Sequence, residues 1–194
     1  MEQIGEIVQQ SRQHLQQHQQ SPSSLQRTNR TELLVQFCEH YSPDYQREIC
    51  GNPEECYFGN YPTLSTLRAE YGKNAAMAFI IPQLQNLATY CGSREKLGEK
   101  QYTECAFVIS TEFHYLKVSE IMLFCHRFKT GRYGRFYGTV DPLIITESLR
   151  TFCTERWNAY ERHEQAQREQ RETESRKNAI TYEQYQQMKK EGKI

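Results

Sequence analysis

The 194-residue sequence lacks any continuous run of about 20 apolar residues, so no transmembrane helix is predicted. Its longest stretch without a charged residue, residues 74–93, is interrupted by Pro82 and by several amides. The N-terminus begins with acidic and glutamine residues and lacks the apolar stretch of a secretory signal. We therefore expect a cytoplasmic protein that has no membrane partner.

The sequence also lacks paired cysteines. Its seven cysteines are odd in number and none lies in a Cys-x-x-Cys motif, which favours reduced thiols over a disulfide framework. Cys38, His40, Cys50 and Cys56 lie near one another in the sequence and leave a small zinc-stabilised domain as an alternative. We predict no cofactor.

Signature motifs of common enzymes are absent as well. The sequence contains no P-loop, no HExxH, no GxSxG and no GxGxxG. Glu112, His114, Glu120 and His126 supply acidic and basic groups in a short stretch, but such residues are more often surface or capping groups. The sequence therefore predicts a protein that is not an enzyme.

The overall charge points to no particular partner, because 24 basic residues balance 24 acidic residues. The local distribution is uneven. Between residues 121 and 140 the charged residues are Arg127, Lys129, Arg132 and Arg135, all of them positive. This basic stretch is the strongest electrostatic feature of the sequence.

Helical periodicity dominates the middle of the sequence and predicts an all-α fold, a compact bundle of about six helices. These helices are predicted to begin near Thr31, Pro62, Asn74, Glu99, Ser119 and Asp141. Residues 40–61 contain several turn-forming residues and are predicted to be a loop. Pro82 predicts a kink or a break at Ile81.

The helical body is predicted to span residues 31–164, between two polar ends. Residues 1–30 contain nine glutamines and too few apolar residues to offset the entropy of ordering, so we expect a disordered arm. The apolar stripe of the last helix includes Trp157 and Tyr160, and a charged tail that is helical by propensity follows over residues 165–194. In that tail, residues 182–190 regain apolar side chains at helical spacing and form a predicted docking peptide.

Residues 127–137 combine basic, aromatic and glycine residues, a mixture that suits contact with nucleic acid. Cations release counterions from phosphates, aromatic rings stack on bases, and glycine lets the backbone approach closely. The predicted nucleic-acid-binding residues are Arg127, Lys129, Arg132, Tyr133, Arg135, Phe136 and Tyr137. The alternative is a turn packed on the helices, with arginines that only reach water.

The sequence contains the segments PTLSTLRAEYGKNAA, IIPQL and STEFHYLKVSEIMLFCHRFKTGRYGRFYGTVDPLIITESLR. Together they resemble an uncharacterised helical family carried on mobile elements and prophages of anaerobic gut bacteria. The similarity spans residues 56–162, and its most specific block is FKTGRYGRFYGTVDP, residues 128–142. In layout, the chain also resembles phage replisome organisers and helicase loaders, which join a compact helical body to a flexible tail that engages the helicase.

These patterns and resemblances predict a non-enzymatic accessory protein of mobile-element or phage DNA metabolism, which contacts DNA through its basic loop. The resemblance implies a replicative helicase or another replication protein as the partner. Because the sequence has no ATPase loop, it would act as an adaptor and not as a motor. The alternative is a protein–protein adaptor without nucleic-acid affinity, which docks through the same loop and through residues 182–190.

Overall fold

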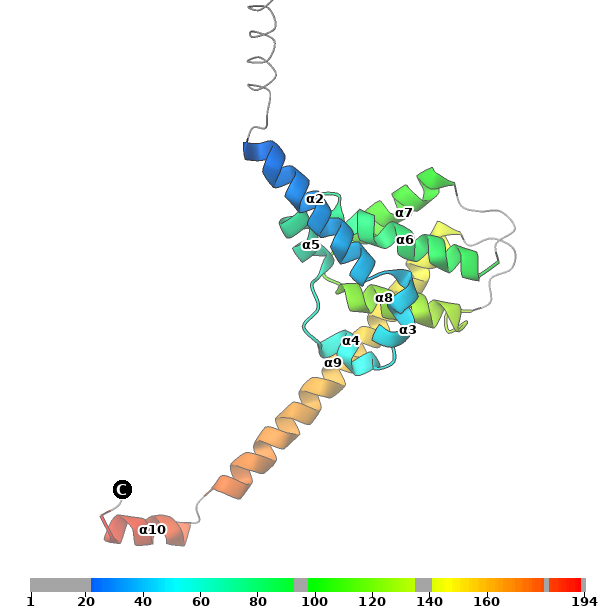
Figure 1. Ribbon diagram of the computed structural model, residues 1–194. Coiled ribbons are helices and arrows are strands. Elements are labelled where there is room, and N and C mark those ends of the chain that lie inside the picture. Colours follow the sequence, from blue (N-terminus) through cyan, green and yellow to red (C-terminus); the bar gives the residue numbers. More distant parts are fainter. Residues whose placement is uncertain (1–21, 93–97, 135–140, 180–181, 193–194) are drawn as a thin grey trace, which may run out of the picture. The chain divides into compact units, whose positions relative to one another are not determined.

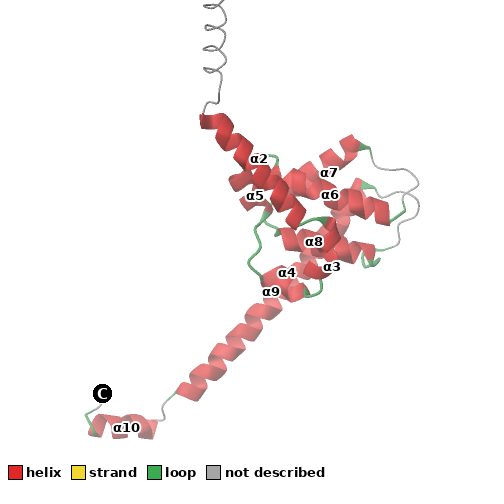
Figure 2. Ribbon diagram, in the orientation of Figure 1, coloured by secondary structure: helices red, strands yellow, loops and turns green. Residues whose placement is uncertain are grey.

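The computed structural model describes residues 22–92, 98–134, 141–179 and 182–192, and every regular element in these ranges is a helix (Figures 1 and 2). The all-α prediction is therefore confirmed. In chain order the elements are α2 (Pro22–His40), the 3₁₀ helix η1 (Pro43–Tyr45), α3 (Gln46–Ile49), α4 (Pro53–Phe58), α5 (Leu64–Tyr71), α6 (Ala75–Tyr90), α7 (Glu99–Glu112), α8 (Val118–Lys129), α9 (Pro142–Asn178) and α10 (Tyr182–Lys190). None of these helices has the length and apolar character needed to cross a membrane.

The chain divides into two compact units, residues 1–148 and residues 149–194. Helix α8 forms the centre of the first unit, because residues 118–125 are all buried and Phe128 is buried as well. A helix whose residues are buried on all sides must pack against neighbours on all sides. Accordingly, α8 contacts α3, α4 and α6, and α6 in turn packs on α7 (Figure 1).

Local capping explains where several of these helices begin and end. Thr63 begins α5 by accepting a hydrogen bond from the backbone N–H of Thr66 at 3.1 Å, and Gly72 ends it with φ of +107°. At the start of α8, the Glu120 carboxylate accepts a hydrogen bond from the Lys117 N–H at 2.9 Å. Asp141 caps α9 through the Leu143 N–H at 2.8 Å, as its sequence position predicts.

The prediction that residues 40–61 form a loop is wrong, because η1, α3 and α4 occupy most of this segment. The prolines that suggested turns stand at the first turns of helices, after the caps Ser42 and Asn52. Proline is favoured there, since the N–H that it lacks would have no partner inside the helix. The same residues that predict a loop therefore begin two short helices.

The first helix begins earlier than predicted, at Pro22 instead of near Thr31. Proline at the start of α2 again fits the first helical turn. Of the predicted disordered arm, residues 22–30 thus belong to α2, and residues 1–21 lie outside the described residues.

Helix α6 runs without interruption through Pro82, so a break at Ile81 does not occur. Proline inside a helix removes one backbone hydrogen bond. Phe79, Ile80, Gln83 and Leu84 are all buried around this position. Tertiary packing on both sides of the proline therefore holds the helix together where the local sequence favours a break.

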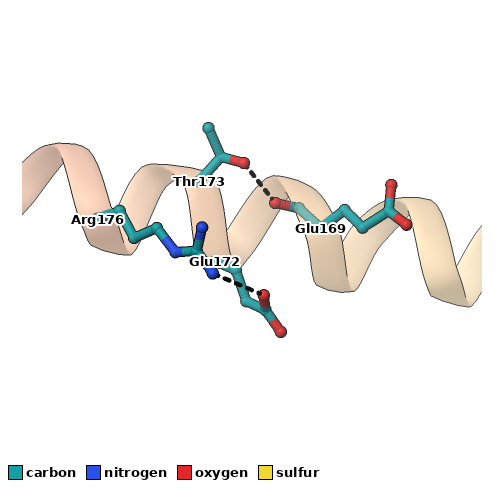
Figure 3. A network of polar contacts seen from close by, with 4 residues as sticks. All are labelled: Glu169, Glu172, Thr173 and Arg176. Carbon is teal, nitrogen blue, oxygen red and sulfur yellow. Dashed lines mark hydrogen bonds and ion pairs between the residues drawn. The ribbon is translucent and has the colours of Figure 1, made fainter.

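In the second unit, residues 161–177 of α9 are all exposed. Contacts between residues four apart support this part of the helix (Figure 3): Arg176 lies 3.8 Å from the Glu172 carboxylate, and the Thr173 hydroxyl donates to the Glu169 carbonyl at 2.7 Å. Exposed pairs of this kind contribute about 0.3–0.5 kcal/mol each. The charged tail is thus helical as its propensity predicts, through Asn178 and again over Tyr182–Lys190.

Candidate functional site

The basic aromatic segment begins in the last turn of α8 and continues into the turn after it. Its described part ends at Gly134, and the predicted site residues Arg135, Phe136 and Tyr137 lie outside the described residues. Gly131 and Gly134 have φ of +76° and +111°, backbone conformations that favour glycine. These two glycines turn the chain back after α8, so that the residues between them lie beside the helix end.

Arg127 is half-buried and binds to α4. Its Nη1 donates a hydrogen bond to the Tyr57 hydroxyl at 2.5 Å, and its guanidinium carbon lies 5.5 Å from the centroid of the same ring. Tyr57 is itself buried. Arg127 therefore joins α8 to α4 inside the first unit, a role that differs from reaching a phosphate in solvent.

Lys129 is also half-buried and belongs to a polar network that links three helices. Its ammonium donates to Oε1 of Gln46 at 2.7 Å and to Oδ1 of Asn86. Gln46 donates in turn to Gln83 at 2.6 Å, and Gln83 donates to the Tyr41 carbonyl at 2.8 Å. Because both glutamines are buried, this network satisfies polar groups that would otherwise destabilise the core.

Burial lowers the pKa of the Lys129 ammonium below its usual value, because the charged form loses water. The nearby thiols of Cys125, Cys50 and Cys91 and the carboxylate of Asp44 act in the opposite direction. The amide oxygens of Gln46 and Asn86 supply hydrogen bonds to the cation in place of that water.

Tyr133 packs its ring on the core. The ring stacks on Phe124 with centroids 5.7 Å apart and lies 6.3 Å from Phe128, both of which are buried. Arg132 differs from its neighbours in that its residue is exposed at the tip of the turn. Its backbone N–H donates to the Arg127 carbonyl at 3.3 Å, which holds the turn against the end of α8.

Arg127, Lys129 and Tyr133 are thus bound to different parts of the first unit, whereas Arg132 is exposed. Sequence reasoning missed the partners of the two cations, Tyr57, Gln46 and Asn86, and it missed Gln83, which accepts a hydrogen bond from Gln46. One signal was available for Gln83, because it is a polar residue within the apolar stripe of α6. A buried glutamine at such a position requires a hydrogen-bonding partner, although the sequence does not say which one.

The other predicted candidates make contacts that support the fold. Among the residues that the structure describes, no three His, Cys, Asp or Glu side chains are grouped to hold a metal ion, so Cys38, His40, Cys50 and Cys56 form no zinc site. Glu120 is buried and caps α8. His114 makes a different contact, with Nδ1 3.0 Å from the Ser65 hydroxyl at an exposed position.

The second unit exposes a tryptophan that the periodicity of the sequence had placed on a buried stripe. Trp157 of α9 is 70% exposed. Beside it, the Arg156 guanidinium carbon lies 4.3 Å from the centroid of the Tyr160 ring. These three residues line a shallow groove along α9 together with Glu161, Glu164, Gln165 and Arg168. We call this groove the Trp157 surface.

A family described as a family of unknown function, DUF6633, matches residues 96–193. This range contains α7, α8, α9 and α10, and it includes both the basic segment and the Trp157 surface. No curated protein and no solved structure matches the chain.

Proposed function

Since the chain belongs to the DUF6633 family, we propose that it is a non-enzymatic adaptor that binds another protein through helices of the family region. The contact lies at the Trp157 surface of α9. The partner presents an apolar cleft that receives the indole of Trp157 and polar groups that meet the charges around it. A mobile-element setting, with a replication protein as partner, is the specific form of this proposal that the sequence resemblance implies.

The exposure of Trp157 is the observation that carries the proposal. An indole that is 70% exposed leaves a large apolar area in water. Tryptophan, tyrosine and arginine are the residues most enriched among energetic hot spots of protein interfaces, and all three types adjoin here. Trp157 and Tyr160 lie three residues apart, a spacing that places both side chains on one face of α9.

The packing of the basic segment also favours a protein partner over nucleic acid. Arg127 and Lys129 already donate to Tyr57, Gln46 and Asn86. Moving either cation to a phosphate would break these contacts and leave buried acceptors without donors. The ring of Tyr133 is stacked on Phe124, so base stacking would require it to leave the core.

The test begins with tagged protein recovered from host cells with and without nuclease treatment. A protein partner that survives nuclease is then purified, and its affinity is measured for the wild type, for Trp157→Ala and for Gln170→Ala. Gln170 is a matched control because it is exposed on the same helix, away from the groove. We expect Trp157→Ala to weaken binding at least tenfold, about 1.4 kcal/mol, and Gln170→Ala to leave it unchanged.

The proposal fails if no protein survives nuclease treatment, or if Trp157→Ala binds as tightly as the wild type. Nucleic-acid binding would give a different pattern. Affinity for DNA would then fall steeply as salt rises, and Arg132→Ala would weaken it, because Arg132 is exposed at the tip of the turn. That result would favour the function that the sequence predicts, an accessory protein that contacts DNA, over the protein–protein adaptor.

A further inference from the structure

An open groove of about 580 Å³ lies between α2, η1 and α6 in the first unit. Its walls are mainly apolar and include Leu34, Val35, Pro43, Tyr45, Ala78 and Pro82. Val35 is 51% exposed and Tyr45 is 46% exposed, so part of this apolar lining is in contact with water. We call this feature the α2–α6 groove. An exposed apolar surface of this kind favours the binding of another apolar surface.

The charged residues that line the α2–α6 groove are both acidic. They are Glu39, in the last turn of α2, and Asp44, in η1, and both residues are exposed. The Asp44 carboxylate accepts a hydrogen bond at 3.3 Å from the hydroxyl of Ser42, which also lines the groove. A segment that fits the groove therefore combines an apolar face with positive charge.

Helix α10 has this combination of properties. Tyr182, Tyr185 and Met188 follow one another at three-residue spacing, which places them on one side of the helix. Tyr182 is 75% exposed and Tyr185 is 41% exposed. Lys189 and Lys190 supply positive charge in the last turn. The sequence predicts a docking peptide over residues 182–190, and the Trp157 surface does not include it.

Within the second unit, a solvent-exposed stretch of helix precedes α10. Residues 161–177 of α9 are all exposed, so no element packs around this stretch within the part of the chain that the structure describes. Because a helix rises 1.5 Å per residue, the stretch separates Tyr160 from the end of α9 by about 25 Å. Helix α10 follows at the end of this stretch, where it is accessible to a second molecule.

We propose that α10 of one copy binds the α2–α6 groove of a second copy and that the reciprocal contact forms a dimer. The apolar side chains of α10 cover Val35 and Tyr45, and its two lysines pair with Glu39 and Asp44. An amphipathic helix that lies in an apolar groove is a common mode of protein recognition. Reciprocal exchange forms two identical contacts and closes the assembly at two copies.

The first test measures the self-association of the full-length protein by sedimentation velocity at increasing concentration. We expect a monomer–dimer equilibrium that Tyr185→Ala weakens by about tenfold or more, because a buried tyrosine of an interface contributes strongly to binding. Gln187→Ala is the matched control. Gln187 is exposed, and because it lies two residues from Tyr185 its side chain is rotated by about 200° around the helix. This change should leave the equilibrium as it is in the wild type.

A pair of valine substitutions tests the groove. Val35→Lys places a positive charge among the groove residues, where it opposes the lysines of α10, so it should weaken the dimer. Val108→Lys is the matched control, because Val108 is also exposed but lies in α7. Both valines are partly in water, so both variants should fold, and circular dichroism melting curves verify this.

Mixing the two weakened variants tests whether the contact joins different molecules. Tyr185→Ala retains an intact groove, and Val35→Lys retains an intact α10. Alone, each variant has one altered side in every contact, whereas a mixed pair has one contact with both sides intact. We therefore expect the mixture to associate more tightly than either variant alone. A contact within one chain would give no such recovery.

The proposal is overturned if the wild type stays a monomer at every concentration, if Val108→Lys weakens the dimer as much as Val35→Lys, or if the mixture shows no recovery. This test is independent of the adaptor contact. Trp157→Ala should form the dimer as the wild type does, because Trp157 belongs to neither the groove nor α10. A failure of self-association and a failure of partner binding are thus separate results.

Discussion

Arg127 of α8 donates a hydrogen bond to the Tyr57 hydroxyl of α4 at 2.5 Å, across 70 residues of sequence. The guanidinium also lies 5.5 Å from the centroid of the ring whose hydroxyl it binds. The sequence predicts that Arg127 binds phosphate, whereas in the structure its side chain links two helices. This contact also joins the centre of the first unit to the segment that contains Cys56, the neighbour of Tyr57.

Replacing Tyr57 by phenylalanine should test this link. The change removes the acceptor for Arg127 and keeps the buried ring, so we expect the free energy of unfolding to fall by about 1–2 kcal/mol. Urea denaturation followed by circular dichroism measures the loss. Tyr182→Phe is the control, because Tyr182 is exposed in α10, and this change should have no measurable effect.

Lys129 should make a pH-dependent contribution to stability. Since burial lowers its pKa in the folded protein, the unfolded chain binds more protons in the window between that lowered pKa and the ordinary value of 10.5. In this window the stability of the wild type should rise with pH relative to Lys129→Met, which cannot titrate. Denaturation curves of both proteins across alkaline pH measure the difference, and parallel pH profiles would contradict the prediction.

Gly72→Ala should destabilise the first unit. Gly72 ends α5 with φ of +107° and ψ of 170°, and no atom lies within 4 Å of an added Cβ, so the cost comes from the backbone alone. We expect a loss of about 1–3 kcal/mol. Gly98→Ala is the comparison variant: Gly98, the N-cap of α7, has φ of −68°, and an added Cβ would lie 3.7 Å from Gln101 Oε1, an ordinary contact, so this change carries no penalty for a positive φ. Thermal unfolding of both variants should show the larger fall in midpoint for Gly72→Ala.

Pro82→Ala should stabilise α6. The change restores a backbone N–H that can donate to the Ala78 carbonyl, and alanine is the better helix former. We expect the free energy of unfolding to rise by about 1 kcal/mol or more. A decrease would show that the packing around Pro82 depends on its ring, which lines the groove between α2, η1 and α6.

Much of the helical architecture was predictable because it depends on local chemistry. The starts of α7 near Glu99, α8 near Ser119 and α9 after Asp141 follow from nearby caps and from apolar residues at helical spacing. Helices α3 and α4 were missed because they are only four and six residues long. Such short helices have no periodicity to detect, and their stability comes from contacts with α8.

By itself, then, the sequence determined the helical class, most helix boundaries and the place of the basic segment, since each of these depends on residues close together in the chain. Only the tertiary structure decided what the side chains of that segment do. Lys129 reaches Gln46 across 83 positions and Arg127 reaches Tyr57 across 70, and no local pattern specifies such pairs. The exposure of Trp157 was decided in the same way, because burial depends on which elements fold against each other.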